Sequence, residues 1–189
     1  MPLTRARAQV ASYYPDLVQP PFPFVSSVAN AVRSANTMYI CRYVMPRSGL
    51  LRDVSVFIQT QSGNLAVGLY DCGEANNTLF TRTYDSGSVA MAAAGAWQVV
   101  ADPQVAVTIG QQLFIGIQID NATASVLNAS ALGSAGADKL PTNFLPYFTN
   151  PLPVVCATQA QGGFTRPASF TQSALTSQTG AICALARIS

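Results

Sequence analysis

The acidic side chains are the residues of this 189-residue sequence that could support hydrolysis or metal binding. Asp71 and Glu74 share one predicted turn, and Asp85 follows soon after it. Calcium needs several oxygen ligands on a flexible loop, and a pair of carboxylates beside a sugar cleft can hydrolyse a glycosidic bond. The spacing does not match a calcium-binding loop, and aspartate is favoured in turns because its side chain hydrogen-bonds the local backbone. We therefore interpret these acids as turn residues.

Histidine is absent, and the sequence has one lysine, Lys139, and one glutamate, Glu74. Without an imidazole there is no Ser-His-Asp or Cys-His relay, no histidine metal ligand and no ordinary general base near neutral pH. Lys139 could in principle form a Schiff base, but nothing in its surroundings supports this role. We predict that the protein is not an enzyme, with no catalytic residues, no cofactor and no metal ligands.

The cysteines are even in number but far apart, and none belongs to a CxxC pair: Cys41, Cys72, Cys156 and Cys183. This spacing argues against a zinc site or a dithiol redox motif. Cys41 and Cys183 lie in apolar strand patterns, where cysteine behaves as a small hydrophobic residue. Buried thiols are the favoured interpretation, and disulfides are the alternative.

Short segments of alternating polarity, separated by Gly, Asn and Pro turns, predict strands at 38–45, 54–59, 65–69, 79–84, 97–99, 105–107, 113–119 and 182–188. Such spacing is typical of an antiparallel sandwich or barrel. No long amphipathic helices alternate with the strands, which argues against a parallel α/β sheet. The predicted fold is all-β, an antiparallel, jelly-roll-like β-sandwich.

Trp97 has two interpretations. An indole ring stacks well on the apolar face of a sugar, and β-sandwiches commonly host lectins. Trp97 alternates with Val99, however, and this pattern favours a residue of the hydrophobic core.

Two segments do not follow the strand pattern. Residues 1–36 are predicted to form an extended arm, in which prolines alternate with Tyr13, Tyr14, Phe22 and Phe24. The spacing of Val25, Val28, Ala29 and Val32 allows one short amphipathic helix there. Residues 37–189 form the predicted sandwich domain, with a long irregular insertion at 133–180 that carries Phe144, Tyr147 and Phe148. Exposed aromatic rings are costly in water, so we expect these seven aromatic residues to bind partners.

Only 10% of the residues are charged, against roughly 25% in an ordinary soluble domain. The net charge of +2 comes from scattered arginines, which argues against nucleic acid as a partner. No apolar run approaches the length of a membrane span, and the first residues lack the hydrophobic block of a signal peptide. A surface with few charges costs little to desolvate, as expected if other subunits cover much of it.

Residues 39–120 contain short motifs in a characteristic order: Met45-Pro46, Gly68-Leu69-Tyr70-Asp71, Ser86-Gly87-Ser88-Val89, Trp97-Gln98-Val99 and Gly110-Gln111-Gln112-Leu113-Phe114-Ile115-Gly116-Ile117. In this order and spacing the region resembles a β-sandwich module of tailed-bacteriophage virion proteins of the minor tail, baseplate or head-decoration type. The resemblance covers less than half of the chain. It implies a structural role and carries no catalytic residues.

The sequence thus leads to two hypotheses. The first is a non-enzymatic virion structural protein of the tail, baseplate or capsid, which assembles in the host cytoplasm with copies of itself and with other virion proteins. The second is a carbohydrate-binding module that recognises a host-surface glycan. Neither hypothesis involves nucleic acid or a membrane.

Overall fold

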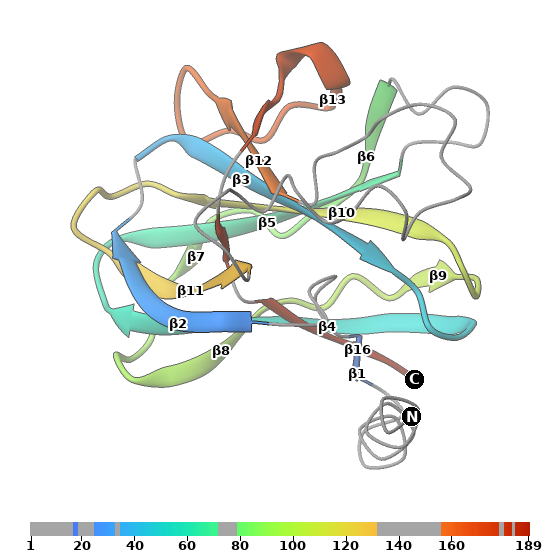
Figure 1. The fold of residues 1–189 in the computed structure, drawn as a ribbon, viewed down its shortest axis with the longest axis horizontal. Coiled ribbons are helices and arrows are strands. Elements are labelled where there is room, and N and C mark those ends of the chain that lie inside the picture. The colour runs from blue at the N-terminus through green and yellow to red at the C-terminus, as the bar shows by residue number, and fades with distance from the viewer. Residues whose placement is uncertain are drawn as a thin grey trace.

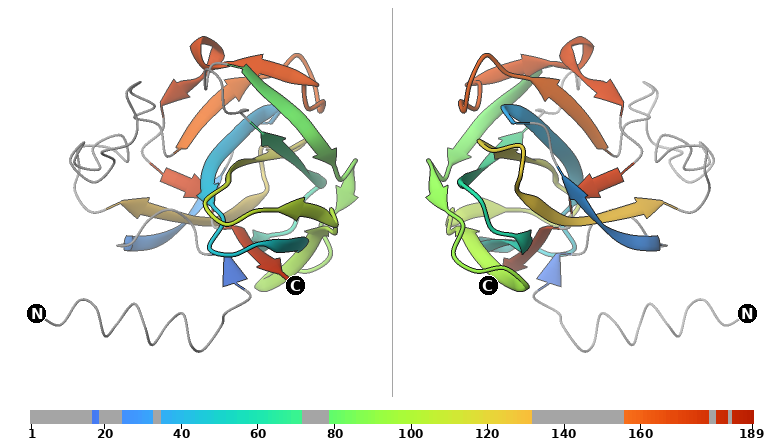
Figure 2. Two further views of the ribbon diagram at one scale, coloured as in Figure 1. Left: turned by 90° about the vertical axis from the view of Figure 1, so that its right-hand side faces the viewer. Right: turned by 90° about the vertical axis from the view of Figure 1, so that its left-hand side faces the viewer.

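The computed structural model describes residues 17–18, 25–32, 35–71, 79–131, 156–177, 180–182 and 184–189. Two antiparallel sheets, each with eight strands, pack face to face (Figure 1). The predicted all-β sandwich is therefore confirmed. Figure 2 shows the two layers from the sides, with strand β1 close to the C-terminus.

Sheet A is built around β4 (Gly49–Thr60), the longest strand. Its strand order is β1 (Leu17–Val18), β16 (Ala184–Ile188), β4, β11 (Ser125–Ala131) and β15 (Gly180–Ile182). Three further strands belong to sheet A but are not in this linear order. Strand β2 (Val25–Val32) pairs with β11, and β8 (Ala96–Ala101) and β9 (Val105–Val107) pair with β4.

Sheet B is centred on β10 (Gln112–Ile119), which lies between β3 (Thr37–Val44) and β5 (Asn64–Asp71). On one side the sheet continues through β6 (Leu79–Asp85) to β13 (Ser169–Thr171), and on the other through β12 (Cys156–Ala160) to β14 (Thr176–Ser177). The short strand β7 (Val89–Ala90) also pairs with β5, and a 3-10 helix spans Gln172–Ala174.

The main hydrophobic core fills the space between the sheets. Sheet A contributes the inward residues of β4, among them Val54, Val56 and Ile58, and sheet B contributes alternate residues of β10, among them Ile115 and Ile117. Every second side chain of a strand points to the same face of the sheet. The apolar residues that alternate with polar ones in the sequence are therefore the ones that form this core. Cys41 is buried in it, and the register sets the backbone of Cys156 opposite Cys41 on the neighbouring strand.

A second core lies on the other face of sheet B. It contains Met38, Ile40, Tyr70, Phe80, Phe114 and Phe170, with Leu175 packed against it. The segment 161–175 supplies Phe170 and Leu175 and covers this face, so both faces of β10 are buried. Four of its rings form three stacked or edge-to-face contacts, and the centroids of Phe80 and Phe170 are 4.8 Å apart.

The segment 1–36 shows no strand pattern in the sequence and its spacing allows a short helix at 25–32, but the structure forms strands there instead. Residues Val25–Val32 form β2, which pairs along its length with β11, and Leu17–Val18 form β1, which pairs with β16. Valine restricts side-chain rotation in a helix and favours strands, and β11 offers an edge with which to pair. The arm is therefore joined to sheet A at two places.

The stretch 133–180, predicted as irregular, contains the strands β12, β13, β14 and the beginning of β15. These strands are only two to five residues long, and their patterns are too short to stand out in the sequence. Strand β11 was not predicted either. Its sequence SVLNASA is poor in large hydrophobic residues.

Candidate functional site

Two of the three acidic residues considered above lie in the described part of the chain. Asp71 ends β5 and Asp85 ends β6, whereas Glu74 lies outside the described residues. No group of three or more acidic or cysteine side chains in the described ranges could hold a metal ion.

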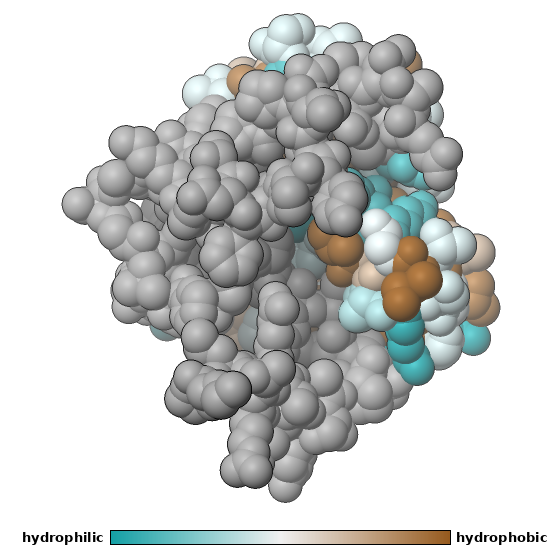
Figure 3. All heavy atoms as spheres, turned by 45° about the vertical axis from the view of Figure 1, so that its right-hand side comes forward, coloured by the Kyte–Doolittle hydropathy of each residue, from teal (hydrophilic) through white to brown (hydrophobic). Residues whose placement is uncertain are grey.

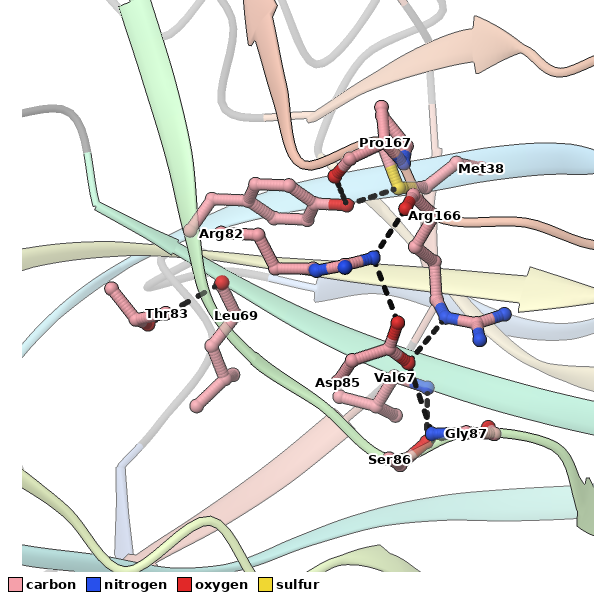
Figure 4. Close-up of polar contacts among 11 residues, drawn as sticks. Met38, Val67, Leu69, Arg82, Thr83, Asp85, Ser86, Gly87, Arg166 and Pro167 are labelled. Atoms are coloured by element: carbon pink, nitrogen blue, oxygen red, sulfur yellow. Dashed lines mark hydrogen bonds and ion pairs between the residues drawn. The ribbon is translucent and has the colours of Figure 1, made fainter.

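Asp85 is instead the centre of an ion cluster, which we call the Asp85 cluster (Asp85, Arg82 and Arg166; Figure 4). Arg82 Nη1 lies 2.7 Å from Asp85 Oδ2, and Arg166 Nε lies 2.6 Å from Asp85 Oδ1. The backbone N–H of Gly87 donates to the same Oδ1 at 2.9 Å. Arg82 also donates to the backbone carbonyl of Arg166. The cluster thereby ties the segment 161–168 to the end of β6.

The surroundings of Asp85 hold its pKa below the ordinary value. Partial burial by itself raises the pKa of this carboxyl, but the hydrogen bond from Arg166, the hydrogen bond from Gly87 and the positive charges of both arginines outweigh the burial. Asp85 is therefore ionised at neutral pH and fully engaged by its donors. A carboxylate in this state is a poor general base, so the cluster supports the fold rather than acid–base chemistry.

Tyr70 completes the attachment of this segment. Its hydroxyl donates to the carbonyl of Pro167 at 3.2 Å, beside Met38 Sδ at 3.4 Å (Figure 4). Burial raises the pKa of Tyr70, which keeps the phenol protonated and neutral. Its ring lies over Gly68 and Gly116, which face each other in the register, because a Cβ added at either glycine would come within 3.1 Å of Tyr70 Cε2.

The surface of sheet A carries a second feature, on β8. Trp97 is 44% exposed and Val99 is 56% exposed, so the prediction that Trp97 belongs to the core is wrong. The alternation correctly put Trp97 and Val99 on one face of the strand, but this face is the outer one. The inner face is occupied by Val100, and Gln98 bonds the backbone of Ala90 and Ala92.

On the outer face of sheet A, Trp97 packs against an aromatic neighbour. Phe57 on β4 lies directly opposite Trp97 in the register, and the two rings meet edge to face with centroids 5.5 Å apart. We call Phe57, Trp97 and Val99 the aromatic strip. Three other large hydrophobic residues are exposed, each by itself: Val44, Leu79 and Ile109. Figure 3 shows hydrophobic residues next to hydrophilic ones on the coloured part of the surface.

The residues predicted to bind partners lie outside the described residues, and the structure does not place them: Tyr13, Tyr14, Phe22, Phe24, Phe144, Tyr147 and Phe148. Sequence reasoning missed the Asp85 cluster, because Arg166 is 81 positions from Asp85 and no local pattern links them.

No protein-family model matches the chain, and no curated protein matches it significantly. In the part of the chain that the structure describes, no helix is long and apolar enough to cross a membrane.

Proposed function

We propose that the protein is a non-enzymatic structural component of a virion of the tailed-phage type, located in the tail, baseplate or capsid. In this role the sandwich is a rigid body that assembles in the host cytoplasm with copies of itself and with other virion proteins. The sequence resemblance and the all-β sandwich support this proposal.

The observation that carries the proposal is the surface of β8. Trp97 and Val99 are large, apolar and half exposed, and β8 has no charged residue. Aromatic side chains supply much of the contact area at protein interfaces, and charged residues are depleted at their centres. A neutral surface of this kind is buried against another subunit at a small desolvation cost.

The second core and the Asp85 cluster support the non-enzymatic part of the proposal. Both fix the segment 161–175 onto sheet B, through packed rings, two ion pairs and hydrogen bonds to the backbone. A scaffold held together in this way suits a protein whose task is to keep a position in an assembly.

The test compares the full chain with a full-length variant in which Tyr13, Tyr14, Phe22 and Phe24 are replaced by serine. Truncation of residues 1–36 is a poor test, because it would remove β1 and β2 from sheet A. Size-exclusion chromatography with light scattering should show an oligomer for the wild type and a smaller species for the variant, with unchanged circular dichroism. A monomer in both cases would contradict the proposal.

The exposure of Trp97 favours a second candidate function, carbohydrate binding. An exposed indole beside Val99 can stack on a sugar ring, as aromatic platforms of binding modules do. A glycan array with the wild type and Trp97→Ala separates the two functions. Sugar binding that is lost in Trp97→Ala without a lower melting temperature would favour this candidate, and no binding to any glycan would exclude it.

A further inference from the structure

Strand β8 lies at an edge of sheet A. Its register partners all belong to β4, from Ala96 opposite Ile58 to Ala101 opposite Val54. In the described ranges no strand pairs with the other side of β8. Alternate backbone N–H and C=O groups of such a strand point away from the sheet, where they can bond to another extended chain.

The pairing of β8 with β4 has one register shift, near its end between Val99 and Ala101, but β8 carries none of the charges or prolines that protect an edge. Natural edge strands are commonly short, charged, interrupted by proline or bent outward. The six residues of β8, AWQVVA, contain no charge and no proline, and Trp97 and Val99 are exposed along them. By contrast, five other edge strands, β1, β9, β13, β14 and β15, are only two or three residues long, whereas β2 is a second long edge strand that pairs only with β11.

We propose that β8 pairs antiparallel with β8 of a second copy of this chain across a two-fold axis, so that sheet A continues from one subunit into the next. This inference rests on the proposed function and names one contact through which the subunits assemble. A two-fold interface uses the same patch on both subunits and must be complementary to itself. A neutral strand meets this condition, because no like charges face each other in the paired arrangement.

The positions of the exposed side chains along β8 determine the register in which two copies of this strand would pair. Residues directly opposite each other in antiparallel strands share a face, so exposed Trp97 must face an exposed residue of the second copy. A two-fold axis through Gln98 sets Trp97 opposite Val99 of the second copy, and Val99 opposite its Trp97. Aromatic and β-branched side chains form favourable cross-strand pairs, and this register forms two of them. In this register the aromatic strips of the two copies, each with its Phe57, also become one continuous strip across the interface.

Hydrogen exchange followed by mass spectrometry tests this contact on the full chain at increasing protein concentration. We expect amide exchange within residues 96–101 to slow as the protein associates. Val99→Lys should abolish both the slowing and the association seen by sedimentation, because a lysine on an edge strand opposes pairing. Val99→Thr keeps the β-branched shape without a charge and should retain association. Ile109→Lys, which adds the same charge at a 71% exposed residue away from β8, should behave as the wild type.

Two results would overturn the proposal. One is a Val99→Lys variant that associates as strongly as the wild type. The other is a wild type that associates while protection appears elsewhere, for example along β2, the other long strand that pairs on one side only. Either result would leave the proposed structural function standing, whereas a wild type that stays monomeric at every concentration would contradict both.

Discussion

Trp97 on β8 and Phe57 on β4 lie directly opposite each other on the outer face of sheet A, with their rings edge to face at an interplanar angle of 76°. The contact holds one side of the indole, and Trp97 remains 44% exposed. A ring held in this way is available for contact without a large loss of side-chain freedom, which favours binding. The pair therefore belongs to the surface through which we expect the protein to act.

Replacement of Trp97 should cost little stability. Trp97→Ala removes a half-exposed ring and one edge-to-face contact, worth about 0.5–1.5 kcal/mol beyond the buried area. Phe80→Ala opens a cavity in the second core and should lower the free energy of unfolding by about 3–5 kcal/mol. Urea unfolding of both variants measures the difference. Equal losses would show that Trp97 acts as a core residue.

Gly116 should not accept even a methyl group. A Cβ at this position would lie 2.8 Å from Met38 Sδ and 3.1 Å from Tyr70 Cε2, between two buried side chains. Overpacking of this kind costs about 1–3 kcal/mol, so Gly116→Ala should lower the midpoint of urea unfolding. Gly162→Ala is the matched control, because nothing lies within 4 Å of a Cβ there. A Gly116→Ala variant as stable as this control would contradict the packing of Tyr70 over Gly116.

The Asp85 cluster should stabilise the protein at neutral pH and lose this effect in acid. Asp85→Asn removes a charge that two guanidinium groups share, and it should reduce the free energy of unfolding by about 1–3 kcal/mol. Asp102→Asn is the control, because Asp102 is exposed and accepts only a long hydrogen bond from Gln104. If Asp85→Asn had the same free energy of unfolding as this control at pH 7, the cluster would not stabilise the fold.

The pH dependence of this difference has a definite sign. Because the pKa of Asp85 is lower in the folded protein, its stabilisation is complete above the unfolded value of about 3.9 and disappears as the pH falls through the folded value. The gap in unfolding free energy between wild type and Asp85→Asn should therefore be constant from pH 7 down to about pH 5 and narrow below about pH 4. Thermal unfolding across this range measures the gap. A gap that widens in acid would contradict the assigned shift.

The sequence predicted the sandwich but not every strand or face. Alternation located β3, β4, β5 and β10, because each has large apolar residues at every second position. It could not show that Phe114 and Gln118 are buried, because the segment that covers them is distant in the chain and has no strand pattern of its own.

The same limit applies to the candidate sites. Alternation put Trp97 and Val99 on one face of β8 but could not distinguish the outer face from the core, since that depends on which face of sheet A packs against sheet B. The link from Asp85 to Arg166 arises only when the segment 161–168 folds back onto β6. Contacts of this kind are set by tertiary packing, and no spacing in the sequence reports them.

The central claim is that the protein works by association with other subunits, beginning with copies of itself. Analytical ultracentrifugation of the intact chain over a wide concentration range tests this claim most directly. We predict a mass that rises with concentration from that of one chain to a defined multiple of it. A single-chain mass at every concentration would contradict the claim.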